Sequence, residues 1–360
     1  MNGCNSNAAR ALETALRKTC DKLLAQGAFA ERIQHTPLMT LFIDEQCIKS
    51  LVTMDDALAA VEEAFHAQGD GGVTNVPRVR VPVKGGILRI TAAVLSYRGY
   101  YGVKISPTAV FGREAGRMFC LYREADGELA AIVQVFAMGA MRTGAASGIA
   151  TKYLANPDAA ILAVLGSGRQ ARTQVEAVCK VRPIREVRVY SPNAAHCEAF
   201  CASFKNNNKN KYLPVANAEQ AIRGADVIVS ATTSEQPVVL GRWLTPGAHI
   251  NAIGANYEHR RELDREAVLA AKFICTDDIE QVRYESTDLA EPVKAGDLSW
   301  ERVHGLSEVV SGKIKGRSAP QDVTLFKSLG VAIEDVALAV RAYEKAVAQN
   351  MGVVLPNLAG

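Results

Sequence analysis

Apolar and polar positions form two different patterns along this chain. Between residues 78 and 136 they predict strands separated by short turns, at 78–83, 86–93, 100–105, 118–122 and 129–136. From residue 161 onwards, apolar strands at 161–165, 186–190, 227–230, 249–253 and 273–276 alternate with helical segments. Consecutive strands indicate a mainly antiparallel sheet, whereas the alternation indicates a doubly wound parallel sheet with helices on both faces.

Helical patterns complete this outline. Asp55 and Asp56 follow Thr53 and precede an apolar-periodic stretch at 57–65, which is typical of a capped helix. Small residues and alanine over 143–154 predict a closely packed helix, and a last long helix is expected at 330–348.

The turn after the strand at 161–165 carries a Gly-x-Gly-x-x-Ala motif, and a helical stretch and a second strand follow it. This spacing is typical of a turn that holds a dinucleotide pyrophosphate at a helix N-terminus. Its residues, Gly166, Ser167, Gly168, Arg169, Gln170 and Ala171, are therefore predicted to bind the cofactor.

The fold class is predicted as α/β, with a Rossmann-type doubly wound parallel sheet inserted in a second α+β domain. The dinucleotide domain is expected over residues 144–322, and the second domain over 38–143 together with 323–360. Residues 1–37 mix basic and acidic side chains, which argues against an organelle transit peptide, and they are interpreted as a leader of unknown role.

The end of the strand at 186–190 bears on the choice between NAD and NADP. NAD-selective enzymes usually place an acid here to bind the ribose 2′-hydroxyl. This chain has Ser191 and Asn193 instead, and Arg169 in the glycine loop adds positive charge. We therefore expect these three residues to favour NADP, with NAD as the alternative.

Composition narrows the possible partners and the compartment. The 360 residues carry a formal net charge of +3, which gives no reason to expect nucleic acid or an anionic membrane as a partner. Apolar runs are too short for a membrane span. The eight cysteines are scattered, so no metal site is predicted, and free thiols favour a reducing compartment such as the cytoplasm.

Isolated cations occupy strand positions in the N-terminal half, namely Arg78, Arg80, Arg89, Lys104 and Arg142. A cation in an apolar strand either faces a cleft, where it binds a carboxylate, or forms an internal salt bridge. Both interpretations stay open for each of these residues. Asn256 follows the strand at 249–253, and it either faces the ligand or caps the turn.

Six segments together resemble the ornithine cyclodeaminase/μ-crystallin family, and the resemblance covers about residues 39–352. They are MRTGAAS at 141–147, ATKYL at 150–154, GSGRQA at 166–171, GAHINAIG at 247–254, RELD at 261–264 and KSLGVAIED at 327–335. Members of this family bind NAD(P), act on amino acids, 2-oxo acids or cyclic imines, and are typically dimers joined through the N-terminal sheet domain.

The resemblance also implies roles for individual residues. Arg78, Lys104 and Arg142 would hold the substrate carboxylate. Arg142, Thr143, Thr232 and Ile253 would contact the cofactor, and Ser328 would lie near the nicotinamide. A homodimer and a small carboxylate substrate are the expected partners.

Two positions depart from the cyclodeaminase pattern. Asn256 stands where a cyclodeaminase has an aspartate as catalytic acid/base, and Arg260 stands where it has a lysine that touches the substrate. An amide does not accept a proton at neutral pH. We therefore expect reduction of a C=N bond next to a carboxylate, or the reverse oxidation of an amino acid. Lys104 would be the proton donor, and Asn256 would orient the substrate nitrogen.

Two alternatives remain beside this interpretation. One is an ornithine or lysine cyclodeaminase that releases ammonia without net change of the cofactor. The other is a non-catalytic protein that binds NADPH and a small ligand.

Overall fold

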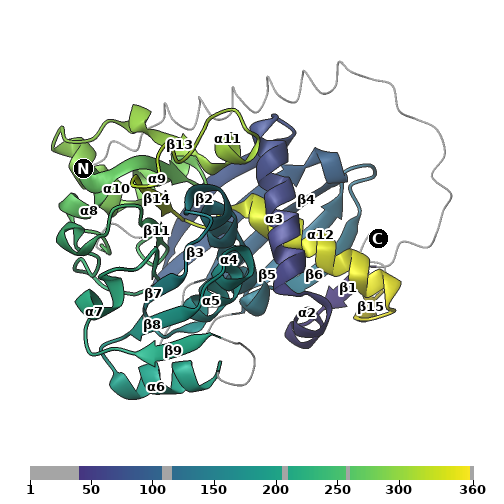
Figure 1. The fold of residues 1–360 in the computed structure, drawn as a ribbon. Coiled ribbons are helices and arrows are strands. Elements are labelled where there is room, and N and C mark those ends of the chain that lie inside the picture. Colours follow the sequence, from purple (N-terminus) through teal and green to yellow (C-terminus); the bar gives the residue numbers. More distant parts are fainter. Residues whose placement is uncertain (1–39, 108–115, 205–209, 257–259, 357–360) are drawn as a thin grey trace. The chain divides into compact units, whose positions relative to one another are not determined.

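Two β-sheets organise the residues that the computed structural model describes, which are 40–107, 116–204, 210–256 and 260–356 (Figure 1). The predicted leader at 1–37 lies outside these residues. The first sheet, called the mixed sheet here, contains β1 (Thr40–Ile43), β2 (Val73–Val83), β3 (Gly86–Leu95), β4 (Tyr100–Pro107), β5 (Met118–Arg123), β6 (Leu129–Gln134) and β15 (Val353–Leu355). The second, called the parallel sheet, contains β7 (Ile161–Leu165), β8 (Glu186–Tyr190), β9 (Lys211–Pro214), β10 (Val227–Ser230), β11 (His249–Ala252), β12 (Ala271–Thr276), β13 (Val303–Gly305) and β14 (Val323–Lys327).

Helices connect and cover the strands. Those in the described part of the chain are α2 (Glu45–Leu51), α3 (Met54–Gly69), α4 (Phe136–Leu154), α5 (Arg169–Val181), α6 (Ala194–Ala202), α7 (Ala218–Ile222), α8 (Arg265–Ala270), α9 (Ile279–Glu285), α10 (Thr287–Lys294), α11 (Leu306–Val310) and α12 (Ala332–Ala348). The cap predicted for α3 is confirmed, because Thr53 and Asp56 form a capping box.

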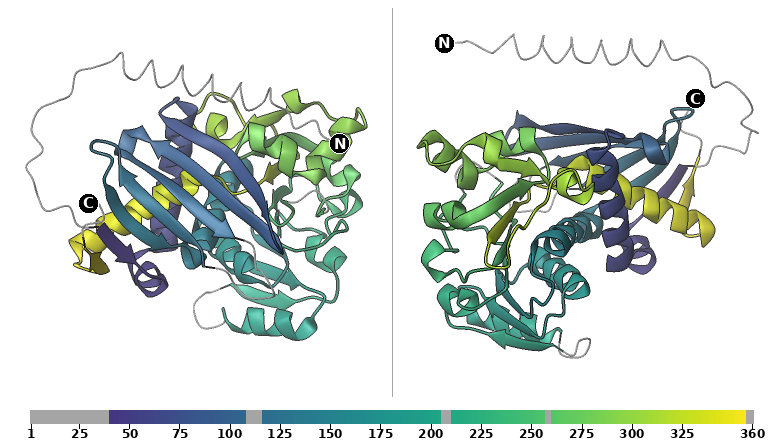
Figure 2. Two further views of the ribbon diagram at one scale, coloured as in Figure 1. Left: turned by 180° about the vertical axis from the view of Figure 1, so that it is seen from behind. Right: turned by 45° about the horizontal axis from the view of Figure 1, so that its top comes forward.

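The mixed sheet has the strand order β15-β1-β6-β5-β4-β3-β2. Pairing from β2 to β6 is antiparallel throughout, as the short turns predict, and β1 adds to β6 in parallel. Successive side chains on these strands point to opposite faces. Helix α12 packs on one face, and the left view of Figure 2 shows the strands in front with α12 behind them.

The parallel sheet has the order β13-β12-β14-β11-β10-β7-β8-β9, and each strand pairs with its neighbours in parallel. The chain runs outward from β7 to β9 and then returns to β10 on the other side of β7. Strands β10, β11 and β14 are buried along their whole length, as expected for a sheet covered on both faces. The predicted doubly wound sheet is confirmed, and its switch point lies between β7 and β10.

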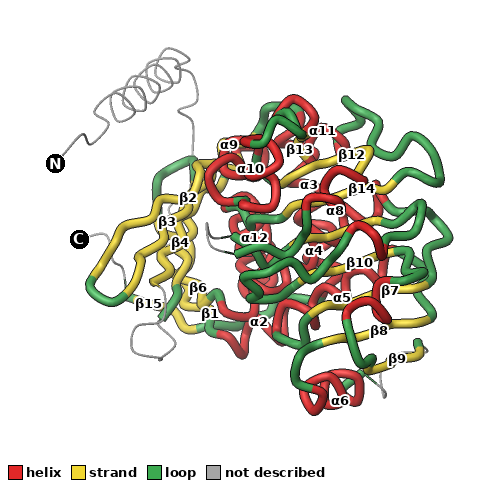
Figure 3. Tube along the Cα trace, turned by 90° about the vertical axis from the view of Figure 1, so that its left-hand side faces the viewer, coloured by secondary structure: helices red, strands yellow, loops and turns green. Residues whose placement is uncertain are grey.

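Helices lie between the two sheets (Figure 3). Helix α12 packs on β2 to β5 of the mixed sheet, α4 packs on β11 and β14, and the two helices contact each other. None of the helices in the described residues is both long and apolar enough to cross a lipid bilayer.

Helix α4 begins earlier than predicted. It starts at Phe136 rather than at 143, so β6 ends at Gln134 and Arg142 lies inside the helix. The carboxylate of Glu45 in α2 accepts hydrogen bonds from the N–H groups of Phe136 and Ala137 and so caps the first turn. Because this cap comes from a residue about 90 positions away, the local pattern does not reveal it.

The domain division stays a prediction, and the structure bears on both of its internal boundaries. The boundary at 143/144 lies inside α4. The boundary at 322/323 precedes β14, which pairs with β11 and β12 in the middle of the parallel sheet. We therefore place that second boundary after Lys327.

The buried ion pair between Lys327 and Asp288 is predicted to stabilise the parallel sheet. Lys327 Nζ lies 2.8 Å from Asp288 Oδ2, and both side chains are fully buried. The substitution Lys327→Met leaves a buried carboxylate without its cation, so we expect a loss of about 3–5 kcal/mol in the free energy of unfolding. Urea unfolding measures this loss. The control is Lys180→Met, which breaks an exposed ion pair with Asp55 and should cost at most about 1 kcal/mol. Equal costs for the two variants would contradict this account.

Candidate active site

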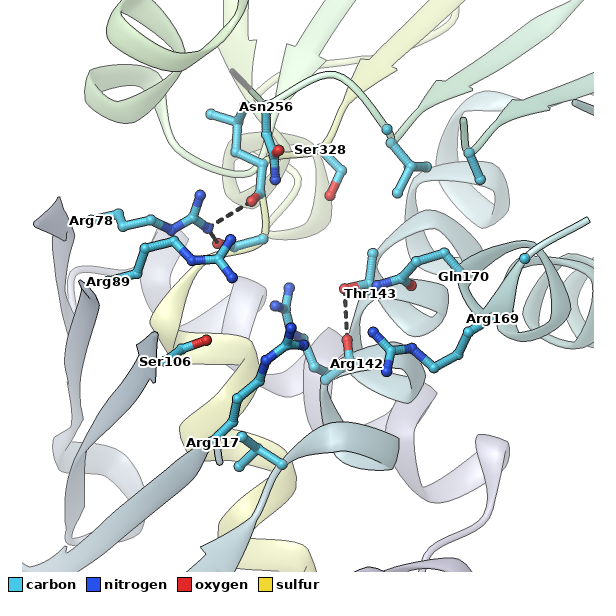
Figure 4. A pocket seen from close by; sticks show the side chains of 18 of the residues that line it. Arg78, Arg89, Ser106, Arg117, Arg142, Thr143, Arg169, Gln170, Asn256 and Ser328 are labelled. Atoms are coloured by element: carbon cyan, nitrogen blue, oxygen red, sulfur yellow. Dashed lines mark hydrogen bonds between the residues drawn. The ribbon is translucent and has the colours of Figure 1, made fainter. Parts of the chain in front are cut away.

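A pocket of about 480 Å³ opens where the carboxyl ends of the parallel strands face the mixed sheet (Figure 4). Open α/β sheets usually bind ligands at this edge, beside the switch point. The pocket is lined from both sides, by residues of β2, β3, β4 and α4 and by the loops that follow β7, β10, β11 and β14.

The loop after β7 has the geometry that a dinucleotide needs. Gly166 has φ of 104°, and a Cβ atom at this position would lie 2.6 Å from the carbonyl oxygen of Ala231. Helix α5 begins directly after Gly168, and no side chain of the described residues caps it. Its first N–H groups are therefore available to an anion, which fits the pyrophosphate of a dinucleotide.

One buried carboxylate fixes the loops after β10 and β11. Glu262 Oε1 accepts hydrogen bonds from Ser230 Oγ at 2.7 Å and from the backbone N–H of Thr232 at 2.7 Å. Its Oε2 accepts from the N–H groups of Gly254 and Ala255. Burial raises the pKa of Glu262. Because five donors, including Thr232 Oγ1, converge on this side chain, it fixes the two pocket-lining loops relative to each other.

A buried ion cluster forms the floor of the pocket. Asp335 Oδ2 accepts a hydrogen bond from Lys104 Nζ, and its Oδ1 lies 3.1 Å from Arg142 Nε. Glu334 Oε2 lies 2.7 Å from Arg142 Nη1. These contacts leave Arg142 Nη2 without a hydrogen-bond partner among the described residues, although Arg142 lines the pocket. Lys104 and Arg142 therefore each form an internal ion pair and also line the cleft, and their binding of a substrate carboxylate stays a prediction.

Arg78 lies in the pocket wall, but protein acceptors already engage it. Its Nη1 lies 2.9 Å from Glu285 Oε2, and its Nη2 donates to the carbonyl oxygens of Leu329 and Gly330. Glu285 also pairs with Arg80, whose Nη2 donates to the carbonyl oxygen of Asn256. This chain of contacts links β2 to α9 and fixes the backbone of Asn256, while the Asn256 side chain points into the pocket (Figure 4).

The loop after β14 is held by Asp277. Its Oδ2 accepts hydrogen bonds from Ser328 Oγ and from the N–H groups of Leu329 and Gly330. Gly330 has φ of 74°, and a Cβ atom there would overlap the guanidinium of Arg142. Glycine at this position therefore lets the loop carrying Ser328 approach Arg142 closely.

The ion cluster changes the proton affinity of its members. Burial lowers the pKa of Lys104 to about 8, with further lowering by Arg142 and Arg78, although Asp335 opposes the change. Burial raises the pKa of Glu334 to about 8, against the influence of Arg142. Burial also favours the neutral form of Asp335, but Arg142 and Lys104 outweigh it, so the pKa of Asp335 lies below its usual value. Lys104 therefore changes charge near neutral pH.

Most of the predicted site residues meet in this pocket. Those that line it are Arg78, Lys104, Arg142, Thr143, Gly168, Arg169, Gln170, Thr232, Ile253, Asn256, Arg260 and Ser328. Gly166, Ser167 and Ala171 belong to the same turn without lining the pocket. Ser191 and Asn193 also lie outside the lining, and the Asn193 side chain caps α6 by accepting from the N–H of His196.

The sequence interpretation missed part of the wall and most of its support. The additional polar lining residues include Arg89, Thr91, Ser106 and Arg117. Arg89 was visible as a strand cation, whereas Arg117 lay at the edge of a turn and gave no signal. The supporting carboxylates Glu262, Glu334 and Asp335 lie in the matched segments at 261–264 and 327–335. Glu334 and Asp335 stand between apolar residues, and that position was a usable signal.

Comparison with known proteins agrees with this geometry. The sequence profile described as the ornithine cyclodeaminase/mu-crystallin family matches residues 39–350. Alanine dehydrogenase of Archaeoglobus fulgidus is 35% identical over 319 residues, which cover 87% of this chain and 97% of that protein.

Two solved structures are similar over nearly the whole fold. Delta(1)-pyrroline-2-carboxylate reductase of Thermococcus litoralis, in complex with NADH and L-proline, has a TM-score of 0.84 and 33% identity over 88% of this chain and 100% of that chain. An archaeal alanine dehydrogenase dimer with bound NAD has a TM-score of 0.82 and 34% identity over 88% of this chain and 99% of that chain. The match along residues 39–350, the shared fold and the dinucleotide loop agree with one another, and the chain belongs to the ornithine cyclodeaminase/mu-crystallin family.

Proposed function

We propose that this protein is an NAD(P)-dependent oxidoreductase that reduces a C=N bond next to a carboxylate, or oxidises the corresponding amino acid. One observation carries the proposal. A single pocket joins the cofactor-facing residues Thr232 and Ile253 to the buried cations Lys104 and Arg142. Its family relatives include a pyrroline-2-carboxylate reductase and an alanine dehydrogenase, whose structures hold NADH and NAD.

The cations would hold the substrate carboxylate. Arg142 offers its Nη2 atom to the pocket, and Lys104 offers a point charge beside it. Arg78 contributes mainly a fixed positive charge, because protein acceptors occupy both of its Nη atoms. These three residues are called the proximal cluster. Asp335 keeps Lys104 and Arg142 in place, so the carboxylate site exists before substrate binds.

Lys104 is the proposed proton donor. When bound, the nicotinamide supplies a hydride to the substrate carbon next to the carboxylate. The nitrogen then needs a proton, and a donor with a pKa near the working pH serves this step best. Asn256 would orient the nitrogen by hydrogen bonding, and Arg80 fixes its backbone for that purpose.

We keep the predicted preference for NADP over NAD as part of the proposal. No acidic residue follows β8, where NAD-selective enzymes usually bind the ribose 2′-hydroxyl. Arg169 lies with its guanidinium 3.5 Å from the centroid of the Phe136 ring, at the cofactor end of the pocket.

A reducing compartment such as the cytoplasm is also proposed. Its support is that Cys197 and Cys275 are buried free thiols.

The first test is consumption of reduced cofactor by the purified full-length protein. NADPH and NADH are each combined with pyrroline-2-carboxylate, piperideine-2-carboxylate and 2-oxo acids with ammonium, and nicotinamide absorbance is followed. We expect oxidation of the cofactor, faster with NADPH. A parallel ammonia assay uses ornithine and lysine with NAD. Ammonia release without net change of the cofactor would show a cyclodeaminase, and binding without any turnover would show a ligand-binding protein.

A pH profile tests the role of Lys104. Protonated Lys104 is needed for imine reduction, so kcat/KM should fall as pH rises through about 8, while amine oxidation should rise through the same range. Lys104→Met should lower kcat by about 100- to 10,000-fold. Lys104→Arg keeps the charge but has a higher pKa, so it should move the fall to higher pH. Near-normal turnover of Lys104→Met, with intact cofactor binding, would contradict the role.

A homodimer is proposed through the outer face of the mixed sheet. Val79, Ile90, Ile105 and Met118 pair across β2 to β5 and form one apolar row on this face. Val79, Ile105 and Met118 are 44–50% exposed, which favours an interaction surface.

Light scattering after size exclusion tests the dimer. The wild-type protein should have twice the chain mass, and the double variant Val79→Asp/Ile105→Asp should be monomeric because it places charges in the contact. Val347→Asp, at a position 51% exposed on α12, is the control and should stay dimeric. A monomeric wild-type protein, or a double variant that stays dimeric, would overturn the assignment of this face.

A further inference from the structure

We propose that the substrate carries a second carboxylate, which makes it a short 2-imino or 2-amino dicarboxylate. The second carboxylate would bind Arg89, Ser106 and Arg117, a group called the distal cluster here. This inference rests on the proposed function and extends it to a substrate class.

The strand register places the distal cluster beside the proximal one. Arg89 of β3 pairs with Ser106 of β4, two residues beyond the pair of Thr91 and Lys104. Arg117 directly precedes β5, whose Met118 pairs with Ile105, so Arg117 lies next to Ser106. Residues two apart on a strand share a face and are separated by about 6.8 Å. The two clusters are thus neighbouring rows on one wall.

The pocket is strongly positive. Among its described lining residues, seven are Arg or Lys and none is Asp or Glu. Carboxylates behind the wall compensate the proximal cluster, because Glu285 pairs with Arg78 and Asp335 pairs with Lys104 and Arg142. A single substrate carboxylate at that cluster leaves Arg117 without an anion from the substrate.

The surroundings of Arg117 indicate that this part of the pocket binds an anion. It has no carboxylate partner among the described residues, and its guanidinium lies 5.9 Å from the centroid of the Phe136 ring. Figure 4 shows Arg89 and Arg117 directed into the same space as Arg142. Like charges held close together repel, and a bound carboxylate removes that repulsion while accepting bidentate hydrogen bonds.

Thr91 provides an independent observation. It lines the pocket, is 3% exposed, and its Oγ1 has no hydrogen-bond partner among the described residues. A buried hydroxyl without a partner is costly, so such atoms usually meet a ligand or water. Thr91 lies in the row of Lys104 and next to the row of Arg89, where a dicarboxylate would pass between the two clusters.

The reaction balances without any additional reagent. A 2-oxo dicarboxylate and ammonia condense to an imine with loss of water. The imine carbon then gains a hydride from NAD(P)H, and the nitrogen gains a proton through Lys104. The products are the 2-amino dicarboxylate and NAD(P)⁺.

Steady-state kinetics with the full-length protein test the proposal. Oxaloacetate and 2-oxoglutarate are compared with pyruvate, each with ammonium and NADPH. We expect kcat/KM to be about 10- to 100-fold higher for one of the dicarboxylates, which is the effect of one additional charged hydrogen bond. Arg117→Met should lower the dicarboxylate-to-pyruvate ratio by a similar factor, mainly through KM. Arg223→Met, which removes an exposed arginine paired with Glu219, should leave the ratio unchanged.

A second measurement uses only the wild-type protein, in case Arg117→Met fails to fold. Malate should inhibit imine reduction at a concentration at least about 10-fold lower than lactate, because it carries the second carboxylate.

Distinct outcomes separate this proposal from the one on which it depends. If pyruvate or a cyclic imine is reduced as well as the dicarboxylates and the ratio does not respond to Arg117→Met, the dicarboxylate inference is wrong while the oxidoreductase remains. If Arg117→Met instead raises KM for NADPH only, the distal cluster serves a cofactor phosphate and the inference is again wrong. If no substrate consumes the cofactor, both proposals fail.

Discussion

One buried ion cluster connects helix α12, helix α4 and strand β4, and the pocket depends on their relative position. Glu334 and Asp335 in the first turn of α12 bind Arg142 of α4, and Asp335 also binds Lys104 of β4. Leaving any one of these groups buried without its partners would be strongly destabilising. The helix, its neighbour and the sheet are therefore fixed relative to one another by the same contacts that build the floor of the pocket. Gly330 completes the arrangement, because any side chain there would overlap the guanidinium of Arg142.

Charge is divided systematically around the pocket. Buried carboxylates stand behind its wall, where Glu262, Asp277 and Glu285 each bind loop N–H groups or a wall arginine. Cations face the ligand space, and no acidic residue among the described lining residues opposes them. These carboxylates satisfy loop N–H groups and hold the loops in place, while the positive potential is left for an anionic ligand. The arrangement suits both the carboxylate of a substrate and the phosphates of a dinucleotide.

Because successive side chains of a β-strand point to opposite faces, the mixed sheet lines the pocket with one face and presents apolar side chains on the other. Arg78, Arg80, Arg89 and Lys104 point toward the pocket, whereas the intervening Val79 and Ile105 point outward and stay exposed. A shift of register by one residue would exchange these faces and place cations outside and apolar side chains in the pocket. Catalytic geometry and the proposed dimer contact therefore depend on one register.

The period of the pattern predicted the main strands of both sheets, the antiparallel or parallel character of each sheet and the capped helix α3, because these follow from neighbours in sequence. The motif segments also determined the family and the dinucleotide loop. Tertiary structure alone decided where α4 begins, since its cap is Glu45. It also placed β14 within the parallel sheet and brought Thr91 and Arg117 to the pocket. It decided which cations are neutralised from behind, as Lys104 is by Asp335, and which have no carboxylate partner among the described residues, as Arg117 has none. These outcomes depend on contacts between residues far apart in the chain. A local pattern of polar and apolar positions therefore does not predict them.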